Sequence, residues 1–118
     1  MRVLVCGDRH WTNEEVIRRE LRSLTAPSVV IHGCARGADT IAGRVAKELG
    51  VTVEEYPAQW SLHGRAAGPI RNRQMLEQGK PDLVLAFHGD LAKSKGTKNM
   101  IEQASKAGVA VRIFGSSS

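Results

Sequence analysis

The chain has few aromatic residues, only two cysteines and no long hydrophobic run, and each shortage excludes a class of protein. Aromatic residues make up 4% of the 118 positions, so we expect a core of Val, Leu, Ile and Ala. Cys6 and Cys34 are too few for a disulfide framework and are typical of a reducing compartment. The longest apolar run, Leu83 to Phe87, is too short to cross a bilayer, and the first seven residues do not form a signal peptide. We therefore expect a soluble, cytoplasmic protein with no membrane partner.

Positive charge is in excess, with 17 Lys and Arg against 12 Asp and Glu and a formal net charge of +5. Such an excess favours anionic partners such as nucleotides or nucleic acid, although basic surfaces also serve solubility. The hydrophobic share of 42% and the charged share of 25% are ordinary for a globular protein. We expect residues 1–114 to form one domain and residues 115–118 to be a flexible tail. Self-association is left open by the sequence.

Five short apolar runs alternate with four amphipathic segments along the chain. The predicted strands are Val3–Cys6, Val29–His32, Val51–Tyr56, Leu83–Phe87 and Val109–Ile113. Most of them are almost continuously apolar, which is typical of strands covered on both faces. The alternation predicts an α/β fold: a single Rossmann-like, doubly wound parallel sheet of five strands with four helices.

Capping residues and apolar periodicity predict where the helices begin. The first helix should begin at a Thr12-x-x-Glu15 capping box, and the third at Gly68-Pro69 with proline at the first helical position. The fourth should begin near Gly96 and bury a stripe that includes Ala107. The one long connection, Pro57 to Ala67, precedes the third helix, and long loops in compact domains are often functional.

Glycines and basic residues follow the predicted strands, at the edge where parallel sheets bind ligands. The strongest segment is Gly33-Cys34-Ala35-Arg36-Gly37-Ala38-Asp39, in which two glycines bracket a strand-to-helix turn and let the backbone approach a ligand. We predict that phosphate and ribose contacts come from this edge. The predicted ligand-binding residues are Gly7, Arg9, Gly33, Arg36, Gly37, Asp39, Arg71, Asn72, Arg73, Gly96 and Thr97.

Basic residues at the predicted helix starts oppose the helix dipole, which normally attracts acidic residues there. Arg36 precedes the second helix, Arg71 and Arg73 lie in or near the first turn of the third, and Lys93 and Lys95 precede the fourth. An anion lying across these helix ends would make the arrangement favourable, because free amides and arginine side chains both bind phosphate. We therefore interpret these residues as a phosphate site.

Other chemistry receives less support. The four histidines show no metal-ligand spacing, and neither the dinucleotide fingerprint nor the P-loop motif is present, so we predict no metal site and no cofactor. His10 and His88 lie at the predicted edge. Trp11 and Trp60 fall in predicted loops, where each suits either stacking on a base or anchoring the loop.

Hydrolysis would need a positioned carboxylate. Asp39 and Glu102 are the candidates for a catalytic residue. Asp39 is the better placed of the two, although an aspartate at a helix start also caps backbone amides. Glu102 lies more than one turn into the fourth predicted helix.

Three segments carry a family resemblance that covers nearly the whole chain. The chain resembles the SLOG superfamily in three segments: Gly33-Cys34-Ala35-Arg36-Gly37-Ala38-Asp39, Gly68-Pro69-Ile70-Arg71-Asn72-Arg73 and Gly96-Thr97. The opening segment, Val5-Cys6-Gly7-Asp8-Arg9-His10-Trp11, also resembles the small YspA-like branch of that superfamily. The superfamily includes cytokinin-activating phosphoribohydrolases and DNA-processing protein A, which binds single-stranded DNA. The resemblance implies a Rossmann-like fold that binds nucleotides or nucleotide-derived signals.

One departure from the phosphoribohydrolases bears on activity. Those enzymes carry Pro-Gly-Gly-x-Gly-Thr followed closely by a catalytic glutamate, whereas here Gly96-Thr97 is followed by Lys98-Asn99-Met100 and the first acid is Glu102. The leading hypothesis is therefore a binding module for a nucleotide or nucleotide-derived small molecule. Two alternatives are N-glycosidic hydrolysis of a nucleoside monophosphate and weak binding of single-stranded nucleic acid, for which the chain has few stacking aromatics.

Overall fold

The computed structural model describes residues 1–24 and 29–115; the last three positions of the predicted tail, 116–118, lie outside the described residues. The strands are β1 (Arg2–Gly7), β2 (Val29–His32), β3 (Thr52–Glu55), β4 (Leu83–Phe87) and β5 (Ala110–Phe114). The α-helices are α1 (Glu14–Ser23), α2 (Ala38–Glu48), α3 (Trp60–His63), α4 (Ala67–Gly79) and α5 (Lys95–Lys106). Two 3₁₀ turns, η1 (Gly64–Ala66) and η2 (Leu91–Lys93), complete the described elements.

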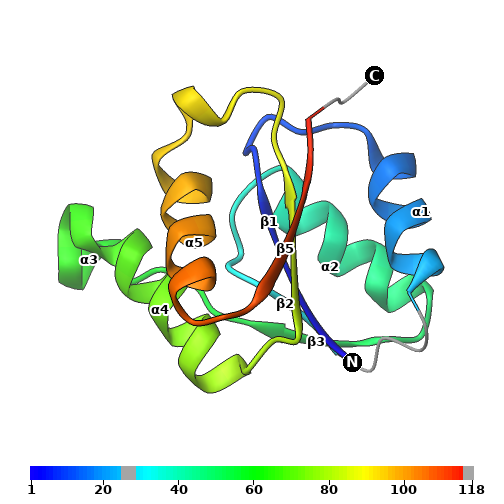
Figure 1. Cartoon of the computed structure of the whole chain (residues 1–118), viewed down its shortest axis with the longest axis horizontal. Coiled ribbons are helices and arrows are strands. Elements are labelled where there is room, and N and C mark those ends of the chain that lie inside the picture. The colour runs from blue at the N-terminus through cyan, green and yellow to red at the C-terminus, as the bar shows by residue number, and fades with distance from the viewer. Residues whose placement is uncertain (25–28, 116–118) are drawn as a thin grey trace.

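All five strands are parallel and form one sheet in the order β3-β2-β1-β4-β5 (Figure 1). This order confirms the predicted Rossmann-like, doubly wound α/β fold. The strand order reverses between β1 and β4, so the loops that follow these two strands lie at the position where such sheets bind ligands. Within the described residues, no helix combines the length and apolar character that a membrane crossing requires.

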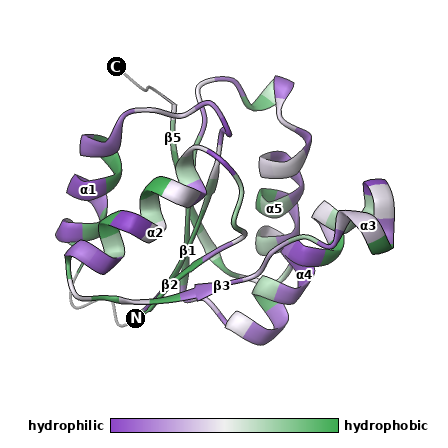
Figure 2. Ribbon diagram, turned by 180° about the vertical axis from the view of Figure 1, so that it is seen from behind, coloured by the Kyte–Doolittle hydropathy of each residue, from purple (hydrophilic) through white to green (hydrophobic). Residues whose placement is uncertain are grey.

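Helices cover both faces of the sheet, with α1 and α2 on one face and α4 and α5 on the other (Figure 1). Two clusters of buried apolar side chains lie between these layers, one on each face. Figure 2 shows apolar colouring on strands such as β1 and β2 and on the inner sides of the helices, whereas the edge strand β3 is hydrophilic. Trp11 belongs to this core rather than to an open loop, because it is 3% exposed and its ring packs edge-on against Phe87 at 5.6 Å.

The start of α1 differs from the predicted capping box by one residue. Asn13, not Thr12, is the N-cap, and its Oδ1 accepts a hydrogen bond from the amide of Val16 at 3.3 Å. Asn13 has the extended backbone that a cap needs, and asparagine is at least as good a cap as threonine. Glu14 and Glu15 occupy the first turn, where the helix dipole favours them.

The region before α4 is more ordered than a plain loop. The predicted connection Pro57–Ala67 contains the one-turn helix α3 and the turn η1, and α4 begins at Ala67 instead of Gly68-Pro69. Pro69 is therefore the third residue of α4, where its missing amide hydrogen costs no helical bond. As a result Arg71 lies in the second turn rather than near the first.

The end of α5 also differs from the prediction. The helix ends at Lys106, and Ala107 is its C-cap and is exposed, so it does not extend the buried stripe of Met100 and Ala104.

Candidate functional site

The turn between β2 and α2 is held by Asp39 from inside the molecule. Asp39 Oδ2 accepts hydrogen bonds from the amides of Gly33 at 2.9 Å and Ala35 at 3.5 Å. The Thr40 hydroxyl adds a bond of 2.7 Å to the carbonyl oxygen of Ala35. Asp39 is 4% exposed, so this carboxyl group fixes the turn at the predicted edge of the sheet.

Burial raises the pKa of Asp39 to about 6, even though the Gly33 amide and the Arg71 guanidinium favour its ionised form. A carboxyl group with such a pKa can exchange a proton near neutral pH. Its buried position and its bonds to the turn describe a group that organises the backbone.

Gly37 brings the β2–α2 turn against the loop that follows β1. It has a φ of +72°, and an added Cβ would stand 2.2 Å from the carbonyl oxygen of Asp8. That carbonyl oxygen accepts hydrogen bonds from the amides of Trp11 and Ala38, both at 3.1 Å. Only glycine fits here, and the close contact joins the two loops on which Arg9 and Arg36 are carried.

Gly7 lies at the base of the same region. An added Cβ would stand 2.2 Å from the carbonyl oxygen of Phe87 and 2.9 Å from the Cβ of Ala38. The next amide, that of Asp8, donates to the Phe87 oxygen at 2.8 Å. Gly7 therefore allows β1 and β4 to pack closely at the base of the predicted site, where a side chain would not fit.

Arg71 and Asn72 connect three parts of the predicted site. Arg71 donates from Nη1 to the carbonyl oxygen of Gly33 at 2.5 Å and from Nε to Asn72 Oδ1 at 3.0 Å. Asn72 is 3% exposed, and its amide nitrogen donates to the Gly96 carbonyl oxygen at 3.3 Å and to Asn99 Oδ1 at 3.1 Å. This chain of bonds runs from the end of β2 through α4 to the start of α5.

The start of α5 is capped by Ser94, whose hydroxyl accepts a bond of 3.1 Å from the amide of Thr97. Thr97 is buried, with 4% exposure, whereas Gly96 faces open space on the side where a Cβ would be. The Gly96 carbonyl oxygen accepts from Asn72, so the start of α5 lies beside that residue. Asn99, which the sequence analysis did not select, lies beside Asn72 as well; its position three residues after Gly96, on the same side of a helix, is the signal that indicates it.

Arg9 and Arg36 are exposed and form no ion pair within the described residues. A shallow hollow of about 480 Å³ adjoins Arg9, between the β1–α1 loop and the start of α2. The residues that line it are Arg9, His10, Trp11, Thr12, Gly37, Thr40 and Ile41. Two of the predicted ligand-binding residues, Arg9 and Gly37, thus border one concave surface.

Two predicted site residues, Arg73 and Glu102, take part neither in the bonds around Arg71 and Asn72 nor in the lining of the hollow. Arg73 is exposed and pairs with Glu77 one turn later on α4, at 2.8 Å. Glu102 is exposed on α5, and its side chain makes no hydrogen bond or ion pair with any described residue. Arg73 lies two residues after Arg71, about 200° further around a helix of 3.6 residues per turn, so it faces away from Gly33.

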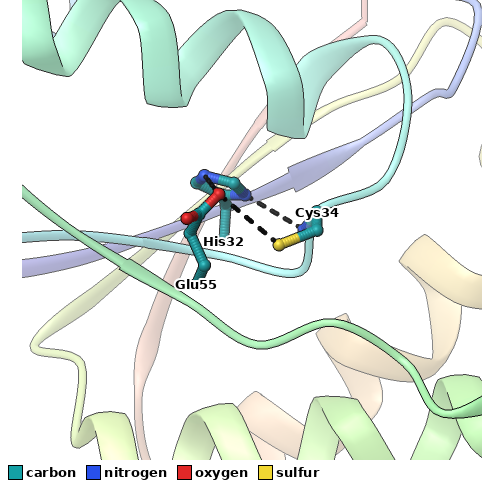
Figure 3. A group of neighbouring side chains, drawn as sticks. All are labelled: His32, Cys34 and Glu55. Carbon is teal, nitrogen blue, oxygen red and sulfur yellow. Dashed lines mark hydrogen bonds and ion pairs between the residues drawn. The ribbon is translucent and has the colours of Figure 1, made fainter.

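Three possible metal ligands lie together at the ends of β2 and β3, at the same edge of the sheet. They are His32, Cys34 and Glu55, whose donor atoms all lie within 4.8 Å of one another (Figure 3). The sequence shows no metal-ligand spacing for this group, because His32 and Cys34 are only two residues apart and Glu55 comes from another strand. The pairing of His32 with Glu55 in the sheet register would have indicated the group.

Comparison with known proteins identifies the family of this chain. Residues 1–63 match the family described as "YspA, cpYpsA-related SLOG family". The chain is 40% identical over 123 positions to the Gene 61 protein of Mycobacterium phage D29, a match that covers 97% of this chain and 96% of the phage protein.

A solved structure shares the fold. DNA processing protein A from Streptococcus pneumoniae superposes with a TM-score of 0.54 at 15% sequence identity, and the match covers 98% of this chain but only 59% of that protein. At this identity the likeness concerns the fold alone. Because the family match spans more than half of the chain and a 40% identical relative spans nearly all of it, the chain belongs to the YspA, cpYpsA-related SLOG family.

Proposed function

We propose that the carboxyl edge of the sheet binds the phosphate group of a nucleotide or a nucleotide-derived small molecule. The proposal rests on the free backbone amides at the start of α2. The amides of Arg36 and Gly37 donate to no acceptor among the described residues, and they precede the first residue of an 11-residue helix. Free amides at a helix N-terminus suit an anion, because the helix dipole adds positive potential there.

The surrounding side chains support an anionic ligand. Arg36 extends from the same turn, and Arg9 extends from the neighbouring loop that Gly37 contacts. Neither has a carboxylate partner in residues 1–24 or 29–115. Two exposed arginines beside free amides supply the fork-shaped donors that phosphate oxygens accept. The adjoining hollow gives space for the rest of a nucleotide-sized molecule.

A small ligand fits this edge better than a nucleic-acid strand. Binding a single strand usually requires several exposed aromatic rings on which bases stack. Trp60 is 60% exposed on α3, but Trp11 and Phe87 are buried in the core. The positions of Asp39 and Glu102 likewise give no pair of carboxylates around one reacting bond, so we assign binding rather than hydrolysis to the site.

The test is a calorimetric titration of the protein with adenosine monophosphate, adenosine and inorganic phosphate. We expect adenosine monophosphate to bind more tightly than adenosine, and Arg36→Glu to weaken it at least about tenfold, which corresponds to about 1.4 kcal/mol. Arg22→Glu is the matched control, because Arg22 is an exposed arginine in the last turn of α1. Equal affinity for adenosine, or an equal loss in the control, would contradict the proposal. Release of free base during the titration would favour the hydrolase instead.

A second titration separates a small ligand from nucleic acid. Affinity for an oligonucleotide falls steeply with salt, because each phosphate contact releases a counterion. We expect an oligo-deoxythymidine to bind weakly and to dissociate near physiological salt. Tight binding at that salt, lost in Arg36→Glu, would make nucleic acid the partner of this edge.

A further inference from the structure

The ends of β2 and β3 bring three chemically different ligand groups to one point (Figure 3). His32 and Glu55 are paired residues in the parallel register of the two strands, so their side chains project from the same face of the sheet. Cys34 follows two residues after His32, in the turn that leads to α2. The imidazole, the thiol and the carboxylate face one another there, rather than pointing separately into solvent.

Two of the distances within this group are close to those of a metal site, and all the donor atoms lie within 4.8 Å of one another. Glu55 Oε2 lies 3.7 Å from His32 Nε2 and 3.7 Å from Cys34 Sγ. Ordinary bond lengths from a tetrahedral zinc ion to nitrogen, oxygen and sulfur place such ligand atoms about 3.3–3.6 Å apart. A small movement of exposed side chains is enough to close that difference, because Cys34 and Glu55 are both exposed.

We propose that His32, Cys34 and Glu55 bind a divalent transition-metal ion of the zinc class. A thiolate and an imidazole prefer zinc-like ions to magnesium or calcium, which take oxygen ligands. The thiolate and the carboxylate together carry two negative charges, which balance the ion. The negative charges of these ligands also offset Lys47 and Arg71, two positive groups close enough to act on His32. Asp39 is a further acid close to Cys34.

The surroundings of His32 determine which nitrogen takes part. His32 is 4% exposed, and α2 carries Gly43 against it, where an added Cβ would stand 2.6 Å from Nε2. Nε2 therefore faces Glu55 beside a position kept free of side chain. Nδ1 accepts the Cys34 amide at 3.0 Å. Coordination through Nε2 places the proton on Nδ1, so the bond from the Cys34 amide has to open when the ion binds. The β2–α2 turn should change its conformation on metal binding.

Three protein ligands leave the fourth tetrahedral position for water or an anion, as in zinc sites that do chemistry. The three ligand side chains are separate from the residues of the proposed nucleotide site, although both sites adjoin the β2–α2 turn. The metal site requires these three side chains, and it does not require Arg9, Arg36 or the free amides of α2.

The test uses tag-free full-length protein stripped with a chelator and titrated with Zn²⁺ by calorimetry and with Co²⁺ by absorption spectroscopy. We expect one ion per chain, a thiolate-to-cobalt charge-transfer band and the ligand-field bands of a tetrahedral ion. Cys34→Ser should abolish the charge-transfer band. It should also weaken Zn²⁺ binding by more than the 10–100-fold that loss of an outer hydrogen-bond partner usually costs.

Glu55→Gln gives an independent readout, because Glu55 is exposed and its replacement carries little risk to folding. It should weaken zinc while leaving the charge-transfer band of bound cobalt in place. The matched controls are Glu102→Gln, an exposed glutamate without partners, and Cys6→Ala, which removes the other thiol of the chain. Zinc should raise the Tm of the wild type and of both controls, but not that of Cys34→Ser. Failure to take up an ion, or an unchanged cobalt spectrum in Cys34→Ser, would overturn the proposal.

Discussion

The guanidinium of Arg71 lies directly over Gly33 and donates a hydrogen bond of 2.5 Å to its carbonyl oxygen. An added Cβ on Gly33 would stand 2.3 Å from Arg71 Nη1, so the absence of a side chain at position 33 is what permits the contact. The bond joins the end of β2 to the second turn of α4. Arg71 is therefore part of the structure of this edge, in addition to the phosphate-binding role that the sequence predicts for it.

Removing Arg71 should destabilise the protein in the absence of any ligand. Arg71→Ala loses the bond to Gly33 and the bond to Asn72, and we expect a loss of about 1.5 kcal/mol in the free energy of unfolding, the usual size for a hydrogen bond from a charged group. Arg73→Ala is the matched control on the same helix and should change stability little, because its pair with Glu77 is exposed. Urea denaturation measures both. Equal effects of the two substitutions would show that the Gly33 contact does not stabilise the fold.

Gly37 should tolerate substitution much less than Gly50, although both have positive φ, of +72° and +75°. Gly37→Ala adds a methyl group 2.2 Å from backbone oxygen, and strain and overpacking together should cost about 3 kcal/mol or more. Gly50 has open space around it, so Gly50→Ala should cost only the conformational strain, about 1 kcal/mol. Thermal or urea unfolding of the two variants checks the order, and a similar loss for both would contradict the close contact with Asp8.

The stability of the protein should depend on pH through Asp39. Its pKa in the folded state is about 6, above the ordinary value of 3.8, so the folded protein holds this proton more tightly than the unfolded chain. Stability should therefore fall as pH rises from about 4 to about 6, by roughly 3 kcal/mol in total, and change no further above that range.

Asp39→Asn removes the titrating group while keeping an oxygen for the Gly33 amide. Urea unfolding of both proteins at pH 4, 5, 6 and 7 isolates the effect, because the other ionisable groups are common to both. The wild type should lose stability relative to the variant across this window. A difference that does not vary with pH would mean that the carboxyl group is not destabilised by burial.

The C-cap of α4 offers a stabilising substitution away from the candidate site. Lys80 has φ of +47° in the left-handed region, where helices usually place glycine. Lys80→Gly should raise the free energy of unfolding by up to about 1 kcal/mol, because the relief of strain exceeds the added flexibility of the unfolded chain. Differential scanning calorimetry should show a higher Tm and no change in ligand affinity. A lower Tm would show that Lys80 is not strained in this cap.

The pattern of the sequence by itself determined the class of fold and the edge at which the candidate site lies. Continuous apolar runs such as Leu83–Phe87 indicate strands covered on both faces, and a strict alternation with amphipathic segments permits few topologies besides a parallel sheet. Glycines such as Gly7 and Gly37 were identifiable because their positions after strands imply tight turns. These inferences depend on local periodicity and on the residues at element ends, which the sequence displays directly.

The tertiary structure decided which residues of that edge meet. Arg71 and Arg73 both lie near the predicted start of the third helix, but in the structure the first contacts Gly33 and the second pairs with Glu77 on the opposite side of α4. His32, Cys34 and Glu55 form one group only because the register pairs β2 with β3 at their last residues. Helix starts shift by one or two residues at little energetic cost, and register depends on the packing of the whole sheet, so neither can be derived from the local pattern.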